Sequence, residues 1–373
     1  MKKKNVIFTA NRGYALKSSR MNIIKRFLDA GYTVVIATAE DEESRYIEEC
    51  GAVLEEVSFN RGGLAPLMDY KAFYRLKSIF RKYRPILVHN FHAKPVILGS
   101  IAARSILKDN VKIINTITGL GHAFIKGGIT SKLAGIGYKL ALQRSDITIF
   151  QNSDDFDLFI GKKWSSKEKS ILIPSSGVDI KKFSYKVRNA KKNNIKIIML
   201  GRLIKQKGIP EFIKIAENIT RDFPSVKFLL AGEEDLIHPD AVTKEWVESH
   251  DSVKYIGRLS NVIPLLENAD ILLFPSYREG VPRVILESAA TGLPTVAFDV
   301  PGVREAVVNN ETGFLVPFKD IELMQKKLIN LIKDNELRVS MGRKARLYME
   351  NKFDYKKVEE QYIRIYQKCG LNV

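Results

Sequence analysis

Short apolar runs alternate with longer amphipathic segments along most of this 373-residue chain. The runs are rich in Ile, Val, Leu and Phe, as strands that are buried on both faces of a sheet usually are. The segments between them repeat apolar residues at helical spacing, which favours crossover helices between parallel strands. The alternation therefore predicts an α/β fold with doubly wound parallel sheets.

The alternation occurs in two series, and the chain is too long for one ordinary core. A polar, basic stretch without periodicity at residues 186–194 separates them as a linker. In the first series we expect strands at 4–9, 33–38, 53–57, 86–89, 112–117, 147–150 and 171–174, and helices from Ser18 or Ser19 to Gly31 and at 70–83, 96–106, 132–143 and 154–160. In the second we expect strands at 195–200, 226–231, 253–256, 271–274 and 295–298, and helices at 210–220, 260–268 and 283–291.

Two Rossmann-like domains that face a central cleft follow from this pattern. We place the first at residues 1–188 and the second at 189–352. The tail, 353–373, repeats apolar residues at helical spacing, and we expect it to form a helix that closes back on the first domain.

Residues 271–287, ILLFPSYREGVPRVILE, hold the strongest candidate site. A buried strand ends at Pro275, a turn at Gly280, Val281 and Pro282 follows, and a helix opens near residue 283. Glu279 in the turn and Glu287 in the helix both face the carboxyl end of the strand, where ligands bind in open α/β sheets. Taken alone, Glu279 could equally be an ordinary surface carboxylate, and Glu287 an ordinary charged residue on a helix face. Together with a helix N-terminus, which offers free amides to phosphate, they favour a binding site.

Two further strand ends in the second series carry basic residues. Arg202 and Lys207 lie in GRLIKQKG at 201–208, and a guanidinium with an ammonium in one loop is suited to clamping a diphosphate. A solvated basic turn is the alternative, and the spacing alone does not decide between them. Gly257 and Arg258 follow another strand, where they could meet a base edge or form an ordinary turn.

In the first series the candidates lie beyond the strands at 86–89 and 112–117. His92 follows the first, and Thr118, Gly119 and His122 follow the second. At one sheet edge an imidazole could orient a sugar hydroxyl or a phosphate, although a histidine satisfied within a loop is equally expected. Asp155 and Asp157 imitate a metal-binding DxD motif, but they follow Ser153 at a helix start, where capping explains acidic residues.

The net charge of +18 is unevenly distributed: residues 1–188 carry 32 basic and 17 acidic side chains. This asymmetry predicts an anionic partner for the first half, either nucleic acid or lipid. A helix at 71–84 mixes aromatic and basic residues, and the apolar-basic loop at 124–126 adds to it, which favours an anionic membrane surface over a sheet-packed helix with a solvated face. We find no signal peptide and no long apolar span, and two cysteines form no disulfide framework, so we expect a cytoplasmic, peripheral protein.

With these motifs in order, the chain resembles the retaining glycosyltransferases of GT-B fold, family 4. The resemblance covers essentially the whole chain and is carried by the two glutamates with GVP, by GRLIKQKG, by SSGVDIKKF at 175–183 and by ITGLGHAF at 117–124. Within the family the chain is similar to bacterial enzymes that extend lipid-linked O-antigen, capsule or protein-glycan precursors, such as N-acetylgalactosaminyltransferases.

The resemblance implies a UDP-sugar donor, such as UDP-GalNAc, an undecaprenyl-diphosphate-linked sugar acceptor and no metal cofactor. It assigns the donor diphosphate to Arg202, Lys207 and the amides of residues 280–282, the transferred sugar to Glu279 and the ribose to Glu287. The base would lie near Gly257 and Arg258. One departure is the first-strand loop, where the family has a glycine pair and this chain has Asn-Arg-Gly-Tyr. Gly13 is then the residue left to approach the donor phosphate or the acceptor. His92, Thr118, Gly119 and His122 would lie on the acceptor side.

Two other functions compete with this interpretation. A UDP-sugar epimerase of the same fold would need no acceptor and would release a free epimer. A nucleic-acid-binding protein would use the basic first half through phosphate contacts, but the chain lacks a recognisable nucleic-acid motif.

Overall fold

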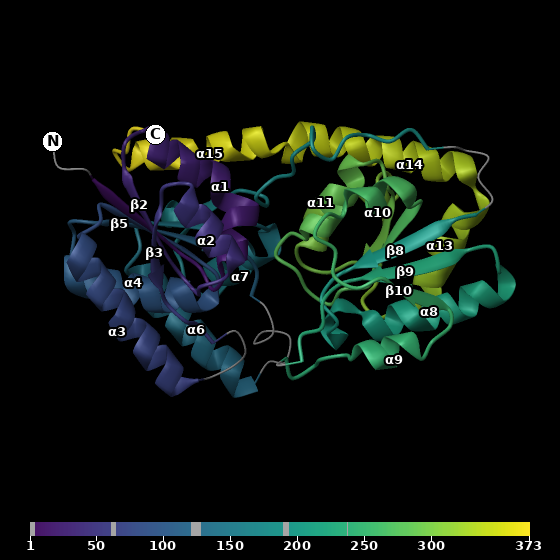
Figure 1. Ribbon diagram of the computed structural model, residues 1–373, viewed down its shortest axis with the longest axis horizontal. Coiled ribbons are helices and arrows are strands. Elements are labelled where there is room, and N and C mark those ends of the chain that lie inside the picture. The colour runs from purple at the N-terminus through teal and green to yellow at the C-terminus, as the bar shows by residue number, and fades with distance from the viewer. Residues whose placement is uncertain (1–3, 61–64, 121–127, 189–193, 237) are drawn as a thin grey trace. The chain divides into compact units, whose positions relative to one another are not determined.

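The computed structural model describes residues 4–60, 65–120, 128–188, 194–236 and 238–373. The chain forms two compact units. The first unit contains residues 1–176 together with Val358–Val373, and the second contains Gly177–Lys357. Each has its own parallel sheet with helices on both faces (Figure 1), so the α/β class expected from the alternating pattern is confirmed.

The first unit is built on a seven-stranded sheet in the order β3-β2-β1-β4-β5-β6-β7. All its strand pairs are parallel, and the order reverses between β1 and β4. Its strands are β1 (Asn5–Thr9), β2 (Thr33–Thr38), β3 (Val53–Glu56), β4 (Leu87–Phe91), β5 (Lys112–Ile117), β6 (Ile147–Phe150) and β7 (Ser170–Leu172). Its helices are α1 (Gly13–Asp29), α2 (Glu42–Glu49), α3 (Pro66–Tyr83), α4 (Ala93–Leu107), α6 (Gly128–Gln143), α7 (Ser153–Gly161) and most of α15 (Tyr355–Lys368).

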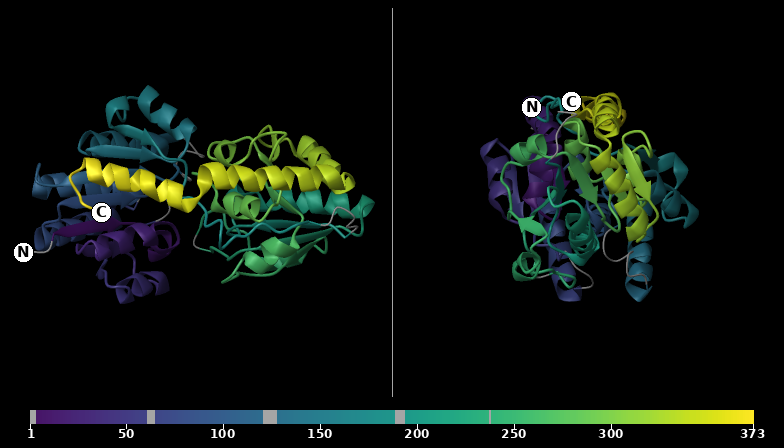
Figure 2. Two further views of the ribbon diagram at one scale, coloured as in Figure 1. Left: turned by 90° about the horizontal axis from the view of Figure 1, so that it is seen from above. Right: turned by 90° about the vertical axis from the view of Figure 1, so that its right-hand side faces the viewer.

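Helix α15 completes one face of this sheet. Its buried side chains join the core formed by α1 and the central strands, and Figure 2 shows the helix lying over the sheet near the C label. Two of its tyrosines also bond to buried polar groups. The hydroxyl of Tyr366 lies 2.8 Å from Nδ1 of His89, and the hydroxyl of Tyr362 accepts from the buried guanidinium of Arg20 at 3.0 Å.

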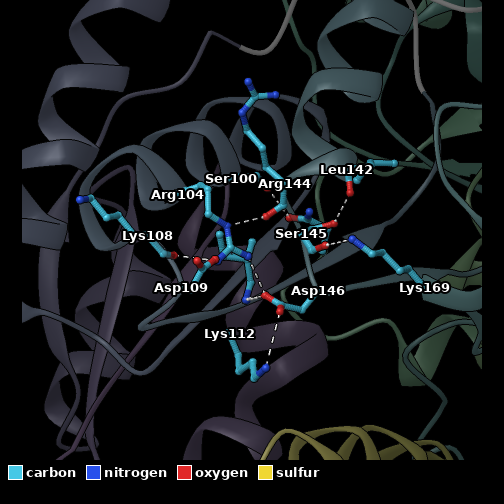
Figure 3. Close-up of polar contacts among 12 residues, drawn as sticks. Ser100, Arg104, Lys108, Asp109, Lys112, Leu142, Arg144, Ser145, Asp146 and Lys169 are labelled. Atoms are coloured by element: carbon cyan, nitrogen blue, oxygen red, sulfur yellow. Dashed lines mark hydrogen bonds and ion pairs between the residues drawn. The ribbon is translucent and has the colours of Figure 1, made fainter.

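An ion-pair cluster ties α4 to the amino end of the sheet (Figure 3). Arg104 donates to Asp146 at 3.0 Å and to the carbonyl oxygen of Arg144 at 2.9 Å. The same Asp146 carboxylate accepts from the amide of Ile113 at 2.8 Å and lies 3.6 Å from Nζ of Lys112. Because these residues begin β5 and precede β6, the cluster stabilises the edge opposite the carboxyl ends of the strands.

The second unit has a six-stranded parallel sheet in the order β10-β9-β8-β11-β12-β13, which reverses between β8 and β11. One core extends through it and both helix layers. Its strands are β8 (Lys196–Leu200), β9 (Lys227–Ala231), β10 (Val253–Tyr255), β11 (Ile271–Phe274), β12 (Thr295–Phe298) and β13 (Gly313–Val316). Its helices are α8 (Ile209–Asp222), α9 (Lys244–Glu248), α10 (Ile263–Asn268), α11 (Arg283–Ala290), α12 (Val303–Ala306), α13 (Ile321–Lys333) and α14 (Asn335–Tyr348).

The division between the units falls at Ser176, earlier than the position 188 expected from the sequence. The segment in between is held by the second unit at several points, and Arg346 donates to the carbonyl oxygens of Ile180 and Phe183. Arg188 is a further point of attachment. Its guanidinium donates to the carbonyl oxygens of Glu267 at 2.7 Å, Leu266 at 3.0 Å and Thr291 at 3.1 Å. A residue that looked like part of a solvated linker is therefore an anchor.

Several elements differ from the sequence expectations. Helix α1 begins at Gly13 rather than near Ser18, and α3 begins at Pro66 rather than at residue 70. The sequence expectations also omitted helices α2, α9, α12, α13 and α14 and strand β13. In the parts of the chain that the structure describes, no helix is both long and apolar enough to cross a bilayer.

Candidate active site

Loops at the carboxyl ends of β8, β9, β10, β11 and β12 converge in the second unit. The loop after β8 runs directly against the loop after β11: the amide of Tyr277 donates to the carbonyl oxygen of Gln206 at 3.0 Å. Gly208 has a φ of +82°, and a Cβ on it would lie 2.1 Å from the carbonyl oxygen of Pro275. This approach therefore requires glycine, which explains the end of the GRLIKQKG motif.

Arg202 and Lys207 are positioned by the loop after β8. Lys207 ends a 3₁₀ turn, Lys205–Lys207, just before α8. Its ammonium lies 2.5 Å from Oε1 of Glu279, and the guanidinium of Arg202 lies 2.5 Å from Oδ2 of Asp235. The structure therefore brings Lys207 and Glu279 together, and each of the two cations has a carboxylate partner.

One carboxylate oxygen of Glu279, Oε1, accepts two hydrogen bonds, one from an ammonium and one from a hydroxyl. Besides Lys207, Oγ of the buried Ser276 donates to its Oε1 at 2.6 Å. No described residue donates to its Oε2. The carboxylate is thus fixed in position while one oxygen remains able to accept from a ligand hydroxyl.

Helix α11 supplies the second glutamate and an N-terminus without a side-chain cap. Pro282 occupies the N-cap position, Val281 is buried in the core, and Gly280 is half-buried. In this arrangement Val281 would contribute its backbone rather than its side chain to a ligand. Glu287 lies one turn into the helix, 2.9 Å from the guanidinium of Arg283, and burial raises the pKa of its carboxyl group in spite of that cation.

Gly257 and Arg258 lie at the end of β10, beside the loop after β9. The carbonyl oxygen of Gly257 accepts from the amide of Gly232 at 2.9 Å, which joins the two loops. Gly257 has a φ of +73° and open space where a side chain would be. Arg258 is exposed and lies 3.5 Å from Glu233. The pair is accessible at the same sheet edge as Arg202.

Gly13 lies in the first unit, where its surroundings differ from those expected of a donor-binding glycine. Its amide donates to Oδ2 of Asp41 at 2.9 Å, and a Cβ at this position would lie 2.2 Å from Oδ1 of the same residue. Asp41 also caps α2 by accepting from the amide of Ser44 at 2.7 Å. A carboxylate therefore occupies the N-terminus of α1, where a phosphate would have to bind.

His92, Thr118 and Gly119 lie together at the carboxyl edge of the first sheet. Phe91 pairs with Thr116, so His92 and Thr118 extend from adjacent strands, and Thr118 and Gly119 are half-buried. His92 has a φ of +71° and a ψ of 164°, a conformation that is rare outside glycine and that often marks functional sites. His122 lies outside the described residues.

Burial and the nearby charge of Arg20 lower the pKa of His92 to about 4. The imidazole is therefore neutral at physiological pH. Its Nδ1 accepts a long hydrogen bond, 3.5 Å, from the amide of Asn11 in the loop after β1. In the tautomer in which Nδ1 accepts this bond, Nε2 carries the proton and can donate to a ligand.

The DxD-like residues do not converge. Asp155 is buried, and its amide donates to the capping side chain of Asn152 at 2.7 Å, whereas Asp157 is exposed. The two carboxylates therefore point to different surroundings at the start of α7. Across the described residues, no three His, Cys, Asp or Glu side chains are grouped so that they could hold a metal ion.

The partners of the candidate residues were not predicted from the sequence. Asp235, Ser276 and Arg283 contact Arg202, Glu279 and Glu287 respectively. Arg283 could have been found from its i,i+4 spacing to Glu287. Asp235 follows β9 in the run Gly-Glu-Glu-Asp, and its position beyond a strand end was a usable signal.

Two family models match the chain. The Glycosyl transferases group 1 model matches residues 181–348, and the Glycosyl transferase 4-like model matches residues 6–152. The chain belongs to the family 4 glycosyltransferases. The resemblance inferred from the motifs is thereby confirmed, and both halves of this glycosyltransferase are accounted for.

Similar proteins include bacterial enzymes that act on lipid-linked sugars. The N,N'-diacetylbacillosaminyl-diphospho-undecaprenol alpha-1,3-N-acetylgalactosaminyltransferase of Campylobacter jejuni is 26% identical over 98% of this chain and 99% of that protein. The UDP-Gal:alpha-D-GlcNAc-diphosphoundecaprenol alpha-1,3-galactosyltransferase of Escherichia coli is 26% identical over 80% of each chain. Both names describe glycosyl transfer to an undecaprenyl-diphosphate-linked sugar.

Solved structures share the fold of this glycosyltransferase over nearly its whole length. Sucrose-phosphate synthase from Thermosynechococcus elongatus has a TM-score of 0.80 at 19% identity and covers 98% of this chain and 99% of its own. Anabaena HepE in complex with UDP and glucose has a TM-score of 0.79 at 18% identity and covers 98% of this chain and 100% of its own. These similarities establish the GT-B fold.

Proposed function

We propose that this glycosyltransferase transfers a sugar, GalNAc or a related hexose, from a UDP-sugar to an undecaprenyl-diphosphate-linked saccharide in surface polysaccharide biosynthesis. The observation that carries the proposal is the ion pair of Lys207 with Glu279, which lies just before α11, together with Arg202 in the same loop as Lys207 at the carboxyl edge of the sheet. Cations and the N-terminus of a helix suit a diphosphate, and a fixed carboxylate suits the hydroxyls of a sugar. The names of the relatives support the lipid-linked acceptor.

The charges in the site suit the departure of a nucleotide diphosphate. As the bond to the sugar breaks, negative charge grows on the diphosphate and the anomeric carbon becomes oxocarbenium-like. Arg202 and Lys207 stabilise the growing charge as fixed cations, and such electrostatic stabilisation is usually the largest contribution to catalysis. Glu279 binds hydroxyls of the transferred sugar, Glu287 binds the ribose, and Gly257 with Arg258 meets the base.

We further propose that the anomeric configuration is retained and that no metal is needed. Glu279 is held by Lys207 and Ser276, so it is suited to binding rather than to acting as a free nucleophile. The acceptor hydroxyl would then attack on the face that the nucleotide leaves, and the departing phosphate oxygen would take its proton. His92 and Thr118 would orient the acceptor, with Nε2–H of His92 as a hydrogen-bond donor.

An anionic membrane surface is the partner that we propose for the first unit. The start of α3 exposes Leu67, Met68, Tyr70 and Tyr74, and Lys77 lies over the ring of Tyr74 at 5.3 Å. Helix α6, which packs with α3 against α4, exposes further apolar residues. These are Leu133, Ile136 and Leu140. Apolar side chains among basic residues, in the half that carries most of the positive charge, suit anionic lipid on the cytoplasmic face.

The test is to incubate the purified protein with UDP-sugars and a synthetic undecaprenyl-diphosphate-linked sugar. Extension of the lipid-linked sugar, with the configuration of the new linkage read by NMR, would support the proposal, and an inverted linkage would contradict retention. Release of a free epimer from UDP-GlcNAc without acceptor would instead indicate an epimerase. Loss of activity in EDTA, restored by a divalent cation, would overturn the metal-free mechanism.

The membrane proposal is tested by flotation with vesicles that contain anionic phospholipid. Binding should fall when Leu67 and Tyr70 are both changed to Ser, while the Tm stays unchanged because both side chains are exposed. Binding to DNA but not to these vesicles at physiological salt would favour the nucleic-acid alternative.

A further inference from the structure

The acidic loop after β9 lies directly against the loop that carries Arg202. The two loops pair through their backbones: the amide of Leu203 donates to the carbonyl oxygen of Glu233 at 2.9 Å, and Leu203 forms a parallel bridge with Glu234. Farther along, the amide of Lys205 donates to the carbonyl oxygen of Asp240 at 2.8 Å. This pairing fixes the register between the loops, so that the side chains of Arg202 and Asp235 face each other.

Asp235 engages one end of the Arg202 guanidinium. Its Oδ2 lies 2.5 Å from NH1, and the side chain of Asp235 is only 10% exposed, whereas that of Arg202 is 40% exposed. The Nε and NH2 groups of Arg202 form no hydrogen bond with any described residue. Nε–H and NH2–H are parallel donors, and they form the pair with which a guanidinium binds two oxygens at once.

We propose that Asp235 is a positioning residue, which holds the guanidinium of Arg202 so that its Nε and NH2 donors face the donor diphosphate. The inference rests on the proposed function, since it takes the diphosphate to bind at Arg202. Asp235 itself does not touch the donor. A long, half-exposed arginine side chain loses rotamer entropy when it binds a ligand, and a carboxylate that already orders it removes part of that cost.

The alternative role for Asp235 is that of a competitor, which must leave Arg202 before a diphosphate can bind. The two roles predict opposite effects of removing the carboxylate: weaker UDP binding if it positions Arg202, and tighter binding if it competes. The single contact at NH1 favours positioning, because it leaves the paired donors available.

The test measures UDP binding by isothermal titration calorimetry for Asp235→Ala and Asp235→Asn. Asp235→Ala should weaken UDP binding about fivefold, as expected for contacting residues in a partly exposed pair. Asp235→Asn keeps an oxygen that accepts from Arg202, so its UDP binding should be within about twofold of the wild type. If Asp235 acted only through its negative charge, the Asn variant would not recover binding.

Glu234 offers a matched control because it lies next to Asp235 and binds the amide of Lys244 at 2.7 Å rather than a guanidinium. Glu234→Gln removes the same charge from the same loop and should change UDP binding by less than about twofold. The Arg202→Ala background completes a double-mutant cycle, in which Asp235→Ala should have no further effect. A cooperative thermal unfolding transition in each variant would establish that its second unit is folded.

Tighter UDP binding by Asp235→Ala, or unchanged binding, would overturn the positioning role. An equal loss in the Arg202→Ala background would also overturn it, because Asp235 would then act by another route. If the wild type does not bind UDP at all, the proposed donor is wrong and the inference falls with it. The wild-type titration therefore separates the two failures.

Discussion

Replacing Lys207 by Ala should affect both the stability of the second unit and the reaction, for separate reasons. In the structure its ammonium lies 2.5 Å from Oε1 of Glu279, whose side chain is only 13% exposed. Without Lys207, this carboxylate keeps a single hydrogen bond, from Ser276. Leaving a buried acceptor partly unsatisfied costs about 1–3 kcal/mol. For a unit of this size, that corresponds to a lowering of the Tm by about 3–9 °C.

The effect on the reaction comes from the lost cation at the diphosphate. Removing one group that stabilises charge in a transition state lowers the rate about a hundredfold to a thousandfold. Adding Glu279→Gln to Lys207→Ala neutralises the stranded carboxylate. The double variant should therefore recover most of the lost Tm, while kcat/KM for the UDP-sugar remains at least about a hundredfold below wild type.

Differential scanning fluorimetry and release of UDP in the presence of the lipid-linked acceptor measure the two effects. Lys205→Ala is a matched control, because Lys205 lies in the same turn, is exposed and has no ion pair among the described residues. It should leave both readouts unchanged. Activity of Lys207→Ala within about threefold of the wild type would refute the role of Lys207 at the diphosphate. A double variant as unstable as the single one would refute the stranded-carboxylate explanation.

Three further predictions concern the other described contacts. Tyr366→Phe removes the hydroxyl that lies 2.8 Å from buried His89 and should lower the Tm of the protein by about 3–9 °C, whereas Tyr74→Phe, an exposed control, should not. His92→Gln should make the free energy of unfolding less steeply dependent on pH between about 4 and 6.5. Because the pKa of His92 is depressed in the folded protein, the unfolded chain binds more protons in this range, and the wild type loses stability as the pH falls. An equally steep pH dependence in the variant would contradict this. Glu287 should contribute a pH dependence of the opposite sign, because its pKa is raised in the folded protein and the wild type therefore loses stability as the pH rises through this titration. The Tm of Glu287→Gln relative to the wild type should consequently increase from pH 4 to pH 7.

Strand positions were well predicted from the sequence because buried parallel strands need continuous apolar runs. The expected strands at 33–38, 271–274 and 295–298 agree with β2, β11 and β12 at both ends. Helix starts were less predictable where a distant residue determines them. The start of α1 depends on Asp41, which lies 28 positions along the chain from Gly13. By contrast, α13 and α14 begin after the capping residues Asp320 and Asp334, so their starts could have been found.

The positions of the candidate residues at the ends of strands could be predicted from the sequence, but the ion pairs between them could not. Arg202, Lys207 and Glu279 could be assigned to one sheet edge from the sequence because residues that follow parallel strands lie at the carboxyl edge of the sheet. Which carboxylate meets which cation depends on loop register, as with Arg202 and Asp235, and spacing along the chain does not encode it. The hydrogen bond of the Gly13 amide to Asp41 likewise could not be predicted, since it joins residues that are close only in three dimensions.

The position of α15 has a consequence for the order in which the chain folds. The hydrogen bond between Arg20 and Tyr362 joins residues 342 positions apart, and Val358–Val373 belongs to the first unit although it is made after the whole of the second. During synthesis the sheet of the first unit therefore leaves the ribosome with one apolar face incomplete, until α15 has also been made. The second unit, whose residues are continuous, meets no such delay. Truncation before α15 should consequently yield chains in which the later unit is native and the earlier one binds chaperones.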